Sequence, residues 1–442
     1  MQRMADTYRT MPSHERLNSL VRKLYREGQR RLHERELSKR SQQRQQDRAL
    51  LATTQLVQIQ RDGDGPSALP PPSDRRVLNQ PEDCYVCKTP YREVHFFYHF
   101  LCPSCAHFNY TMRSLRADLT GRTALVTGGR VKIGYQLVLR LLRDGARVLV
   151  TTRFPHAAAR RFEAEPDSAD WQERLHLYGL DLRNLPAVEA FAARLLDQEA
   201  SLEIVVHNAA QTIQRPLGFY QELLAQEERP QEMLTAAARR LVVSSSPLGA
   251  SEGSMLPALG LADVLPLAEM HDHEERVDSR DINSWLLPIE GVGAREMLEV
   301  QLVNSVAPFL LNGRLKPLLL RSPFDRRFIV NVSAMEGQFS RHKTVYHPHT
   351  NMAKAALNMM THTCAAGFAR ERIYMNSVDT GWVTDENPTP MRLRKQEELG
   401  FFAPLDIVDG MARIYHPIAL GVHSPDPPFS GQFLKDYAPC KW

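Results

Sequence analysis

The stretch GRTALVTGGRVKIG, residues 121–134, contains three local signals in the order strand, turn and helix. Its apolar run, residues 124–127, is typical of a buried strand, and Gly128 and Gly129 follow directly. Such a turn lets the backbone come close to a pyrophosphate, and the start of the next helix faces the negative charge. The stretch therefore predicts that a dinucleotide-binding unit begins near residue 121.

Similar apolar runs recur along the chain and alternate with amphipathic stretches. Runs typical of parallel strands occupy residues 148–152, 204–207 and 328–332, and helices are expected over residues 134–143, 186–197 and 348–368. This alternation predicts an α/β fold, a Rossmann-like doubly wound parallel sheet, over residues 113–442. Residues 215–290 are acidic and then rich in Ser, Gly and Pro, so we expect them to form an insertion in this domain.

The composition is that of a folded, soluble protein. Of the 442 residues, 43% are hydrophobic and 24% are charged, which is close to a globular average and excludes wholesale disorder. The longest apolar stretch is broken by Asn304 and Pro308, well short of the roughly 20 residues of a membrane helix. Residues 1–20 lack the apolar core of a secretory signal, and scattered acidic residues disfavour organelle import. We therefore expect a cytoplasmic protein without a membrane partner.

Positive charge is concentrated at the N-terminus. Residues 1–50 contain 13 Lys or Arg and 6 Asp or Glu, so this part carries +7 and the rest of the +4 chain sums to −3. We expect residues 1–60 to be a basic arm with a long helix over residues 13–48, and the Pro/Gly-rich residues 61–82 to be a linker. The arm is either a site for RNA or an acidic protein, or a solvated helix that confers solubility.

Four cysteines form two CxxC pairs within a segment that we delimit as residues 83–112. Cys84 pairs with Cys87 and Cys102 with Cys105, and fourteen residues separate the two pairs. Two such turns can supply four thiolates to one tetrahedral Zn²⁺, and a complete shell leaves no open position for a substrate. The spacing therefore predicts a zinc-binding module in which the metal is structural and supplies folding energy.

From residue 121 to the C-terminus the chain resembles the short-chain dehydrogenase/reductase family. Thr127, Gly128 and Gly134 match the TGxxxGxG cofactor signature of that family. Lys132, however, stands at the position of the middle glycine. The resemblance implies a nicotinamide dinucleotide as cofactor, and Lys132 leaves weakened or lost cofactor binding as an alternative.

Further motifs follow in the order that the family has them. His207-Asn208-Ala209-Ala210 is similar to the NNAG motif, Asp181-Leu182 to the acidic position near adenine, and residues 376–381 (NSVDTG) to the cofactor-side turn, with Thr380 in place of proline. The resemblance implies a cofactor site composed of Thr127, Gly128, Gly129, Arg130, Lys132, Ile133, Gly134, Arg153, Asp181, Leu182, Asn208, Ala209, Ala210, Lys354, Thr380 and Gly381.

The choice between NAD and NADP depends on charge at the end of the second strand. Family members that prefer NAD usually carry an acid there, which accepts hydrogen bonds from the ribose 2′-hydroxyl. This chain has Arg153, and Arg130 and Lys132 add positive charge nearby. We therefore expect NADP(H), unless these three residues are ordinary surface charges.

The resemblance also implies the catalytic positions. Asn304 matches the asparagine that anchors a proton-relay water, Ser333 the serine that positions the carbonyl, and Lys354 the lysine that binds the nicotinamide ribose. The family has a tyrosine four residues before that lysine, on the same helix face. Here that residue is Thr350, whose hydroxyl is a poor proton donor.

Three neighbours are alternative proton donors. Tyr346 lies thirteen residues after Ser333, at a distance that is usual in the family, but in the loop before the expected helix. His347 and His349 flank the helix start, and a water ordered by Thr350 is a further option. All three side chains are otherwise ordinary loop residues.

Two functions remain open from the sequence. The first is an NADP(H)-dependent oxidoreductase acting on a small carbonyl or alcohol that the sequence does not identify. The second is a catalytically silent dinucleotide-binding scaffold that docks on RNA or a protein complex through its zinc module and basic arm. The family commonly dimerises through its long helices, so a homodimer is one expected oligomeric state.

Overall fold

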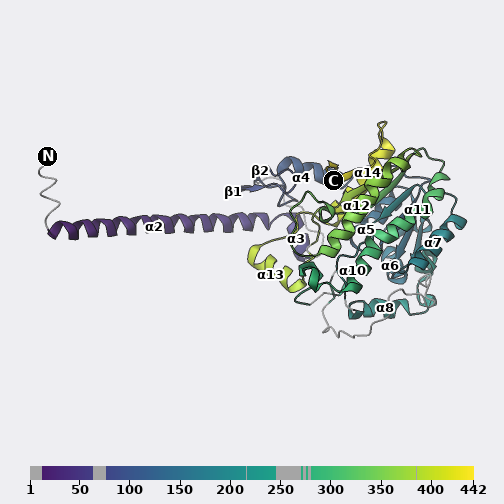
Figure 1. Ribbon diagram of the computed structural model, residues 1–442, viewed down its shortest axis with the longest axis horizontal. Coiled ribbons are helices and arrows are strands. Elements are labelled where there is room, and N and C mark those ends of the chain that lie inside the picture. Colours follow the sequence, from purple (N-terminus) through teal and green to yellow (C-terminus); the bar gives the residue numbers. More distant parts are fainter. Residues whose placement is uncertain are drawn as a thin grey trace. The chain divides into compact units, whose positions relative to one another are not determined.

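The structure is a computed structural model that describes residues 12–62, 76–215, 217–244, 270–271, 275–276, 280–384 and 386–442. The chain falls into two compact units, residues 1–106 and residues 107–442, which are taken in turn (Figure 1). Of the predicted linker, residues 63–75 lie outside the described residues, and so does most of the predicted insertion beyond residue 244.

The first unit combines a long basic helix with the cysteine segment. Helices α2 (Pro12–Leu51) and α3 (Gln55–Asp62) precede strands β1 (Val77–Asp83) and β2 (Pro90–Glu93), which pair antiparallel. Helix α4 (Pro103–Met112) begins in this unit and ends in the second. The long helix that the sequence predicts over residues 13–48 is confirmed and is a few residues longer.

One buried carboxylate fixes the end of α2 to β1. Asp47, only 6% exposed, accepts hydrogen bonds from the backbone N–H groups of Asn79 (2.7 Å) and Gln80 (3.0 Å). By contrast, residues 17–42 of α2 are exposed throughout. The helix is therefore anchored at its C-terminal end and solvated over most of its length.

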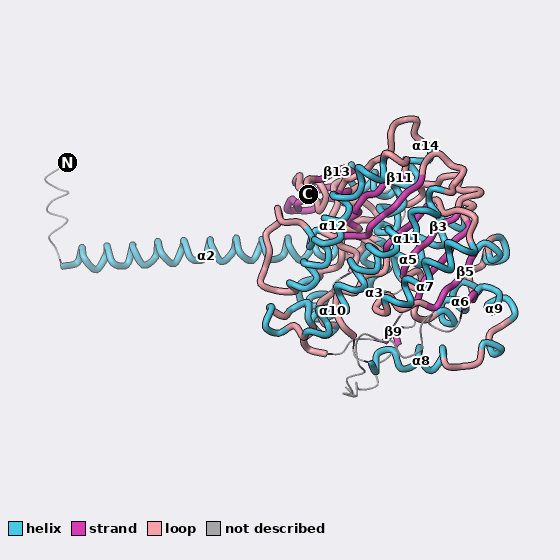
Figure 2. Tube along the Cα trace, turned by 45° about the vertical axis from the view of Figure 1, so that its right-hand side comes forward, coloured by secondary structure: helices cyan, strands magenta, loops and turns pink. Residues whose placement is uncertain are grey.

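Nine described strands form the sheet of the second unit, in the order β13-β12-β11-β10-β6-β3-β4-β5-β7. Figure 2 shows strands of this sheet in magenta, among them β3, β5 and β11. The bounds are β3 (Thr123–Thr127), β4 (Arg147–Thr152), β5 (Leu175–Gly179), β6 (Ile204–His207), β7 (Val242–Ser244), β10 (Arg327–Ser333), β11 (Ile373–Asp379), β12 (Phe433–Lys435) and β13 (Ala438–Cys440). All neighbours are parallel except β12 and β13. This confirms the predicted Rossmann-like doubly wound sheet.

Strand order reverses between β3 and β6, which is where such sheets open a crevice for a ligand. The chain runs outward from β3 through β4 to β5, and outward from β6 through β10 and β11 to β12. A separate two-stranded pair, β8 (Met270–His271) and β9 (Glu275–Arg276), lies within the predicted insertion. Strand β7, which also belongs to the insertion, pairs with β5 at the edge of the main sheet, so the insertion extends that sheet.

Helices cover both faces of the sheet (Figure 1). One core contains side chains of α5 (Lys132–Arg143), α6 (Pro155–Glu163), α9 (Ala236–Leu241) and α14 (Ile407–His423), and the other contains those of α7 (Leu185–Gln198), α11 (Ala307–Leu320) and α12 (Pro348–Ala369). Within β3, Val126 faces the first core and Leu125 the second. Because both faces are buried, the strands are continuously apolar, as the sequence showed.

Three further helices complete the unit. They are α8 (Gln221–Glu227), α10 (Ala294–Gln301) and α13 (Thr389–Leu399). Where α10 meets α11, residues Leu302–Val306 form a π-helical turn. None of the described helices is both long and apolar enough to cross a lipid bilayer.

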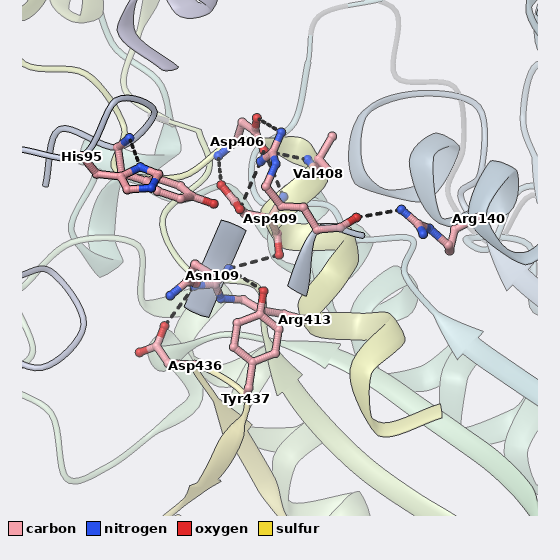
Figure 3. A network of polar contacts seen from close by, with 11 residues as sticks. His95, Asn109, Arg140, Asp406, Val408, Asp409, Arg413, Asp436 and Tyr437 are labelled. Carbon is pink, nitrogen blue, oxygen red and sulfur yellow. Dashed lines mark hydrogen bonds and ion pairs between the residues drawn. The ribbon is translucent and has the colours of Figure 1, made fainter. Parts of the chain in front are cut away.

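A buried arginine holds the C-terminal hairpin β12–β13 against α14 (Figure 3). Arg413, 2% exposed, donates hydrogen bonds to Asn109 Oδ1 (2.7 Å) and Asp436 Oδ1 (3.2 Å). Asp436 and Tyr437 both have positive φ angles, 48° and 70°, in the hairpin turn. The neighbouring Lys435 bonds to Asp436 (2.9 Å) and lies 3.6 Å from Asp379, so the hairpin reaches the end of β11.

Candidate dinucleotide and catalytic site

The glycine turn after β3 is packed so tightly that side chains are excluded. A Cβ on Gly134 would lie 2.2 Å from the Gly128 carbonyl oxygen and 2.4 Å from the Asn208 amide nitrogen. A Cβ on Gly129 would lie 2.6 Å from the Val150 side chain. Gly128 has a φ of +70°, which L side chains rarely adopt. The turn therefore has the close approach that a pyrophosphate site requires.

Hydrogen bonds join this turn to the end of β6 across the reversal of strand order. The side-chain amide of Asn208 donates to the carbonyl oxygens of Thr127 (3.2 Å) and Gly128 (2.9 Å). The backbone N–H of Ala209 donates to the Thr127 hydroxyl (3.1 Å). Ala210 follows in the same exposed turn. The segment that begins at Asn208 is thus bonded directly to the glycine turn.

Lys132 takes the backbone conformation of the glycine that it replaces. Its φ is +54°, in the left-handed region that favours glycine, and its side chain is exposed. The neighbouring Ile133 instead packs toward α14, where a Cβ on Gly410 would come within 2.7 Å of it. Lys132 therefore costs backbone strain but does not fill the turn with a buried side chain.

Two arginines gather near the end of β4. The Arg153 guanidinium lies over the rings of Tyr220 (4.5 Å) and Phe154 (5.2 Å), and Arg130 lies 5.4 Å from the Phe154 ring. Arg130 is 6% exposed and Arg153 is half-buried. The structure therefore brings these two predicted residues together on one aromatic ring.

Asp181, just beyond β5, forms a bidentate pair with Arg183. The three nitrogen–oxygen hydrogen bonds between them are 2.6 to 3.0 Å long. Burial raises the pKa of Asp181, but hydrogen bonds from Arg183 and the charge of Arg153 outweigh it, so the net pKa lies below the ordinary value. Leu182, 6% exposed, belongs to the core beneath. Asp181 is thus ionised, as an acceptor near a cofactor would be.

Lys354 is buried on α12 at the carboxyl end of β10. It is 6% exposed, and its Nζ donates a hydrogen bond to the Val332 carbonyl oxygen (2.9 Å). Burial lowers the pKa of Lys354 to about 8, partly offset by the charges of Glu336 and Asp379. This lysine therefore loses its proton more easily than an ordinary lysine.

Ser333 and Asn304 are both buried and hydrogen-bonded within the protein. The Ser333 hydroxyl, 2% exposed, lies 2.6 Å from Asn358 Oδ1 and donates its proton to it. The Asn304 amide donates to the carbonyl oxygens of Gln211 (2.7 Å) and Val300 (2.8 Å), from within the π-helical turn. Ser333 can therefore accept but not donate a hydrogen bond toward a substrate in this arrangement.

The predicted proton donors are spread around the start of α12. Thr350, 4% exposed, donates to the Thr212 carbonyl oxygen (3.1 Å). Tyr346 lies in the loop before the helix and is 43% exposed. His347 stacks on the Trp285 ring, with centroids 3.9 Å apart. The tyrosine and this histidine are thus held outside the helix that carries Lys354.

His349 differs from those neighbours because it is fully buried. It is 2% exposed, and neither ring nitrogen has a hydrogen-bond partner among the described residues. Burial lowers its pKa, although the Glu296 carboxylate opposes this shift. His349 is therefore neutral at pH 7.

The turn after β11 closes the site on its other side. Gly381 has a φ of +77°, and its N–H donates to Asp379 Oδ1 (2.9 Å), with Thr380 between them. Burial raises the pKa of Asp379, and the charge of Lys435 partly offsets it. Because parallel strands place their carboxyl ends at one edge, this turn lies at the same edge as Thr127 and Ser333.

The sequence did not point to Asp379 or Tyr220 as members of this region. Asp379 is part of the NSVDTG turn, but that motif does not mark it as a site residue. The signal that could have identified it is its position as the last residue of a buried strand. Tyr220 comes from the predicted insertion, 67 positions after Arg153, and no local pattern marks it. Long-range packing alone brings it to the site.

In the first unit, the four cysteines converge. The sulfur atoms of Cys84, Cys87, Cys102 and Cys105 all lie within 4.8 Å of one another, and those of Cys87 and Cys102 are 3.7 Å apart. A hydrogen bond from Thr89 lowers the pKa of Cys87 to about 6, whereas burial raises the pKa of Cys105. Four sulfurs at this separation are a donor set that a metal ion can bind.

Comparisons with known proteins agree with this architecture. The family model described as short chain dehydrogenase matches residues 122–229. The uncharacterized protein R665 of Acanthamoeba polyphaga mimivirus is 34% identical over 349 residues, which cover 76% of this chain and 71% of that protein. Dehydrogenase/reductase SDR family member 13 of Bos taurus is 39% identical over 94 residues, 21% of this chain and 24% of that protein.

A solved short chain dehydrogenase from Shigella flexneri aligns with 74% of this chain and 95% of its own, at 17% identity and a TM-score of 0.47. Against the curated reductases, this chain spans about a quarter of their length. The residues that match the family model, 122–229, contain the glycine turn and Asn208. The chain belongs to the short-chain dehydrogenase/reductase family.

Proposed function

We propose that the protein is an NADP(H)-dependent oxidoreductase that interconverts a carbonyl and an alcohol. The observation that carries the proposal is that the close-packed glycine turn after β3 and the buried Lys354 beside the end of β10 lie at the same, carboxyl edge of the sheet.

The residues present fit a dinucleotide. The cradle at Gly128 and Gly134 would be filled by any Cβ, while the Lys132 side chain points to solvent and leaves it open. We assign the pyrophosphate to this turn, the adenine side to Asp181 and the 2′-phosphate to Arg153. When bound, the nicotinamide supplies or accepts a hydride.

On the catalytic side, Lys354 would bind the nicotinamide ribose through donors that its bond to Val332 leaves available. Thr350 lies one helical turn before it on the same face of α12. We propose that a water between these two side chains passes the proton to the substrate oxygen and regains it from the Lys354 ammonium. Asn304 would help to hold the waters that carry this proton. The Ser333 oxygen would accept a hydrogen bond from the hydroxyl group of an alcohol substrate.

Titration of the purified protein with NADPH and NADH, followed by nicotinamide fluorescence, tests the cofactor. Tighter binding of NADPH supports the proposal, and binding of neither contradicts it. A carbonyl panel then tests turnover, with Lys354→Ala expected to lose it and Lys316→Ala, at a half-buried lysine of α11 that pairs with Glu371, expected to keep it. Turnover that survives in Lys354→Ala would remove Lys354 from the mechanism, whereas binding without any turnover would favour the scaffold function.

We further propose that Cys84, Cys87, Cys102 and Cys105 hold one structural Zn²⁺. What supports this is the convergence of the four sulfurs from two turns that are well separated in sequence. Metal analysis of the purified protein tests it: about one zinc per chain is expected, and a metal-free protein of unchanged stability would contradict it.

A further inference from the structure

An aromatic and guanidinium stack joins the insertion to the end of β4. The rings of Phe154 and Tyr220 are 5.5 Å apart and inclined by 30°, and Arg153 lies against both. Tyr220 ends a short 3-10 turn (Leu217–Tyr220) directly before α8. One side of the Arg153 environment is therefore built from the main domain and the other from the insertion.

Two contacts with α6 fix the position of Tyr220. Leu223, 3% exposed, packs on Phe154 and Ala157. The Glu227 carboxylate accepts hydrogen bonds from the backbone N–H groups of His156 (3.0 Å) and Ala157 (2.9 Å), at the first turn of α6. With both ends of α8 attached, the Tyr220 ring is held in place rather than left on a loose loop.

Arg153 stands at the carboxyl edge of the sheet with its charge unneutralised. It directly follows β4, which pairs in parallel with β5 so that Thr152 lies opposite Gly179, and Asp181 comes just after that neighbouring strand. Among the described residues, no carboxylate lies within ion-pair distance of Arg153. Its contacts are to ring faces, and stacking of this kind leaves the N–H edge of a guanidinium directed outward.

We propose that Tyr220 is a positioning residue that holds Arg153 for recognition of the 2′-phosphate of NADP(H), so that the insertion sets the cofactor preference. This inference rests on the proposed function. A stacked guanidinium keeps its plane fixed and presents two parallel N–H donors to a phosphate. NADH carries a hydroxyl in place of the 2′-phosphate, so fixing the plane of the Arg153 guanidinium should add little to its affinity.

The test compares Tyr220→Leu with Tyr220→Phe, measuring dissociation constants for NADPH, NADH and the fragment 2′,5′-ADP. Tyr220→Leu should weaken NADPH and 2′,5′-ADP by about 3- to 30-fold, the range of a cation–π contact, and leave NADH within about twofold. Tyr220→Phe keeps the ring and should behave as the native protein.

A second arm separates positioning from general damage to the insertion. In an Arg153→Met background, Tyr220→Leu should have no further effect on NADPH, because the partner is absent. Arg153→Lys keeps a positive charge but removes the planar guanidinium that stacks on Tyr220, so it should lose NADPH affinity, and adding Tyr220→Leu should lower that affinity little further. The inference would be overturned if Tyr220→Leu weakened the affinities for NADPH and NADH equally. It would also be overturned if Tyr220→Leu weakened NADPH binding as much in the Arg153→Met background as in the native protein. If the native protein binds neither coenzyme, it is the proposed function that fails.

Discussion

Gly134 and Asn208 lie so close that a single methyl group would not fit between them. A Cβ on Gly134 would be 2.4 Å from the Asn208 amide nitrogen, which itself donates to the Gly128 carbonyl oxygen. The first turn of α5 and the segment after β6 therefore depend on each other. A side chain at Gly134 would push apart the two walls of the proposed pyrophosphate site.

The first prediction concerns this contact. Gly134→Ala should lower the free energy of unfolding by roughly 1–3 kcal/mol, as overpacking does, and should abolish binding of NADPH and NADH alike. Gly313, inside helix α11 with open space around it, is the matched control. Gly313→Ala should raise stability by about 0.5–1 kcal/mol because alanine favours helices. Urea unfolding measures both, and equal effects of the two variants would contradict the packing argument.

A second prediction concerns the glycine that the family signature lacks. Because Lys132 has a φ of +54°, Lys132→Gly removes roughly 1 kcal/mol of backbone strain, which offsets the entropy cost of glycine. Unfolding stability should therefore stay within about 0.5 kcal/mol of the native protein. Gln136, further along α5, has no such strain, so Gln136→Gly should lose about 1 kcal/mol or more. A loss of that size in Lys132→Gly would contradict the assignment of strain.

The third prediction uses the buried charge of Lys354. Its pKa is about 8 in the folded state against 10.5 for an ordinary lysine, so between these values the unfolded chain binds more protons than the native one. The free energy of unfolding should therefore rise with pH between about 8 and 10.5, by roughly 3 kcal/mol at most for this group. Below about pH 8, Lys354 is charged in both states, so burial of its ammonium lowers the free energy of unfolding by the full amount.

Lys354→Met should remove this increment. The difference in unfolding free energy between Lys354→Met and the native protein should then shift in favour of the native protein as pH rises from 7 to 9.5. Lys316→Met, at a half-buried lysine of α11 that pairs with Glu371, is the control over the same range. Urea denaturation at several pH values provides the comparison, and a flat difference for Lys354→Met would show that the ammonium is not desolvated.

The parts of the fold with local causes were predictable from the sequence. Residues 121–134 specify strand, turn and helix by themselves, and Pro348 marks the start of α12, which was expected over residues 348–368 and spans Pro348–Ala369. The direction of side-chain hydrogen bonds was not predictable. That the Ser333 hydroxyl is engaged by Asn358 depends on how α12 packs on β10, and only tertiary structure determines that.

The same holds for the contributions of the insertion. Strand β7 pairs with β5 at the edge of the sheet, and Tyr220 contacts Arg153. Both come from the insertion, whose sequence has only a weak hydrophobic pattern. These contacts arise from burial against α6 rather than from local propensity. Family resemblance did not reveal them either, because the matched motifs lie outside the insertion.

The fourth prediction concerns the metal. Cys102 is 7% exposed and lies in the four-cysteine cluster, whereas Cys364 on α12 is half-buried and far from it in sequence. Cys102→Ser should therefore lose bound zinc, while Cys364→Ser should keep it. If the four cysteines hold zinc as proposed, its loss should destabilise the short strands β1 and β2 and with them the bonds of Asp47 to Asn79 and Gln80.

The consequence should be confined to the first unit. Limited proteolysis of Cys102→Ser is expected to cut near residues 77–105 first, and NADPH affinity should stay at the native value. Treatment of the native protein with a zinc chelator should reproduce the same cleavage pattern, which Cys364→Ser should not show. Full retention of zinc in Cys102→Ser would mean that the metal is bound elsewhere, because three thiolates alone would leave an open shell and a weaker site.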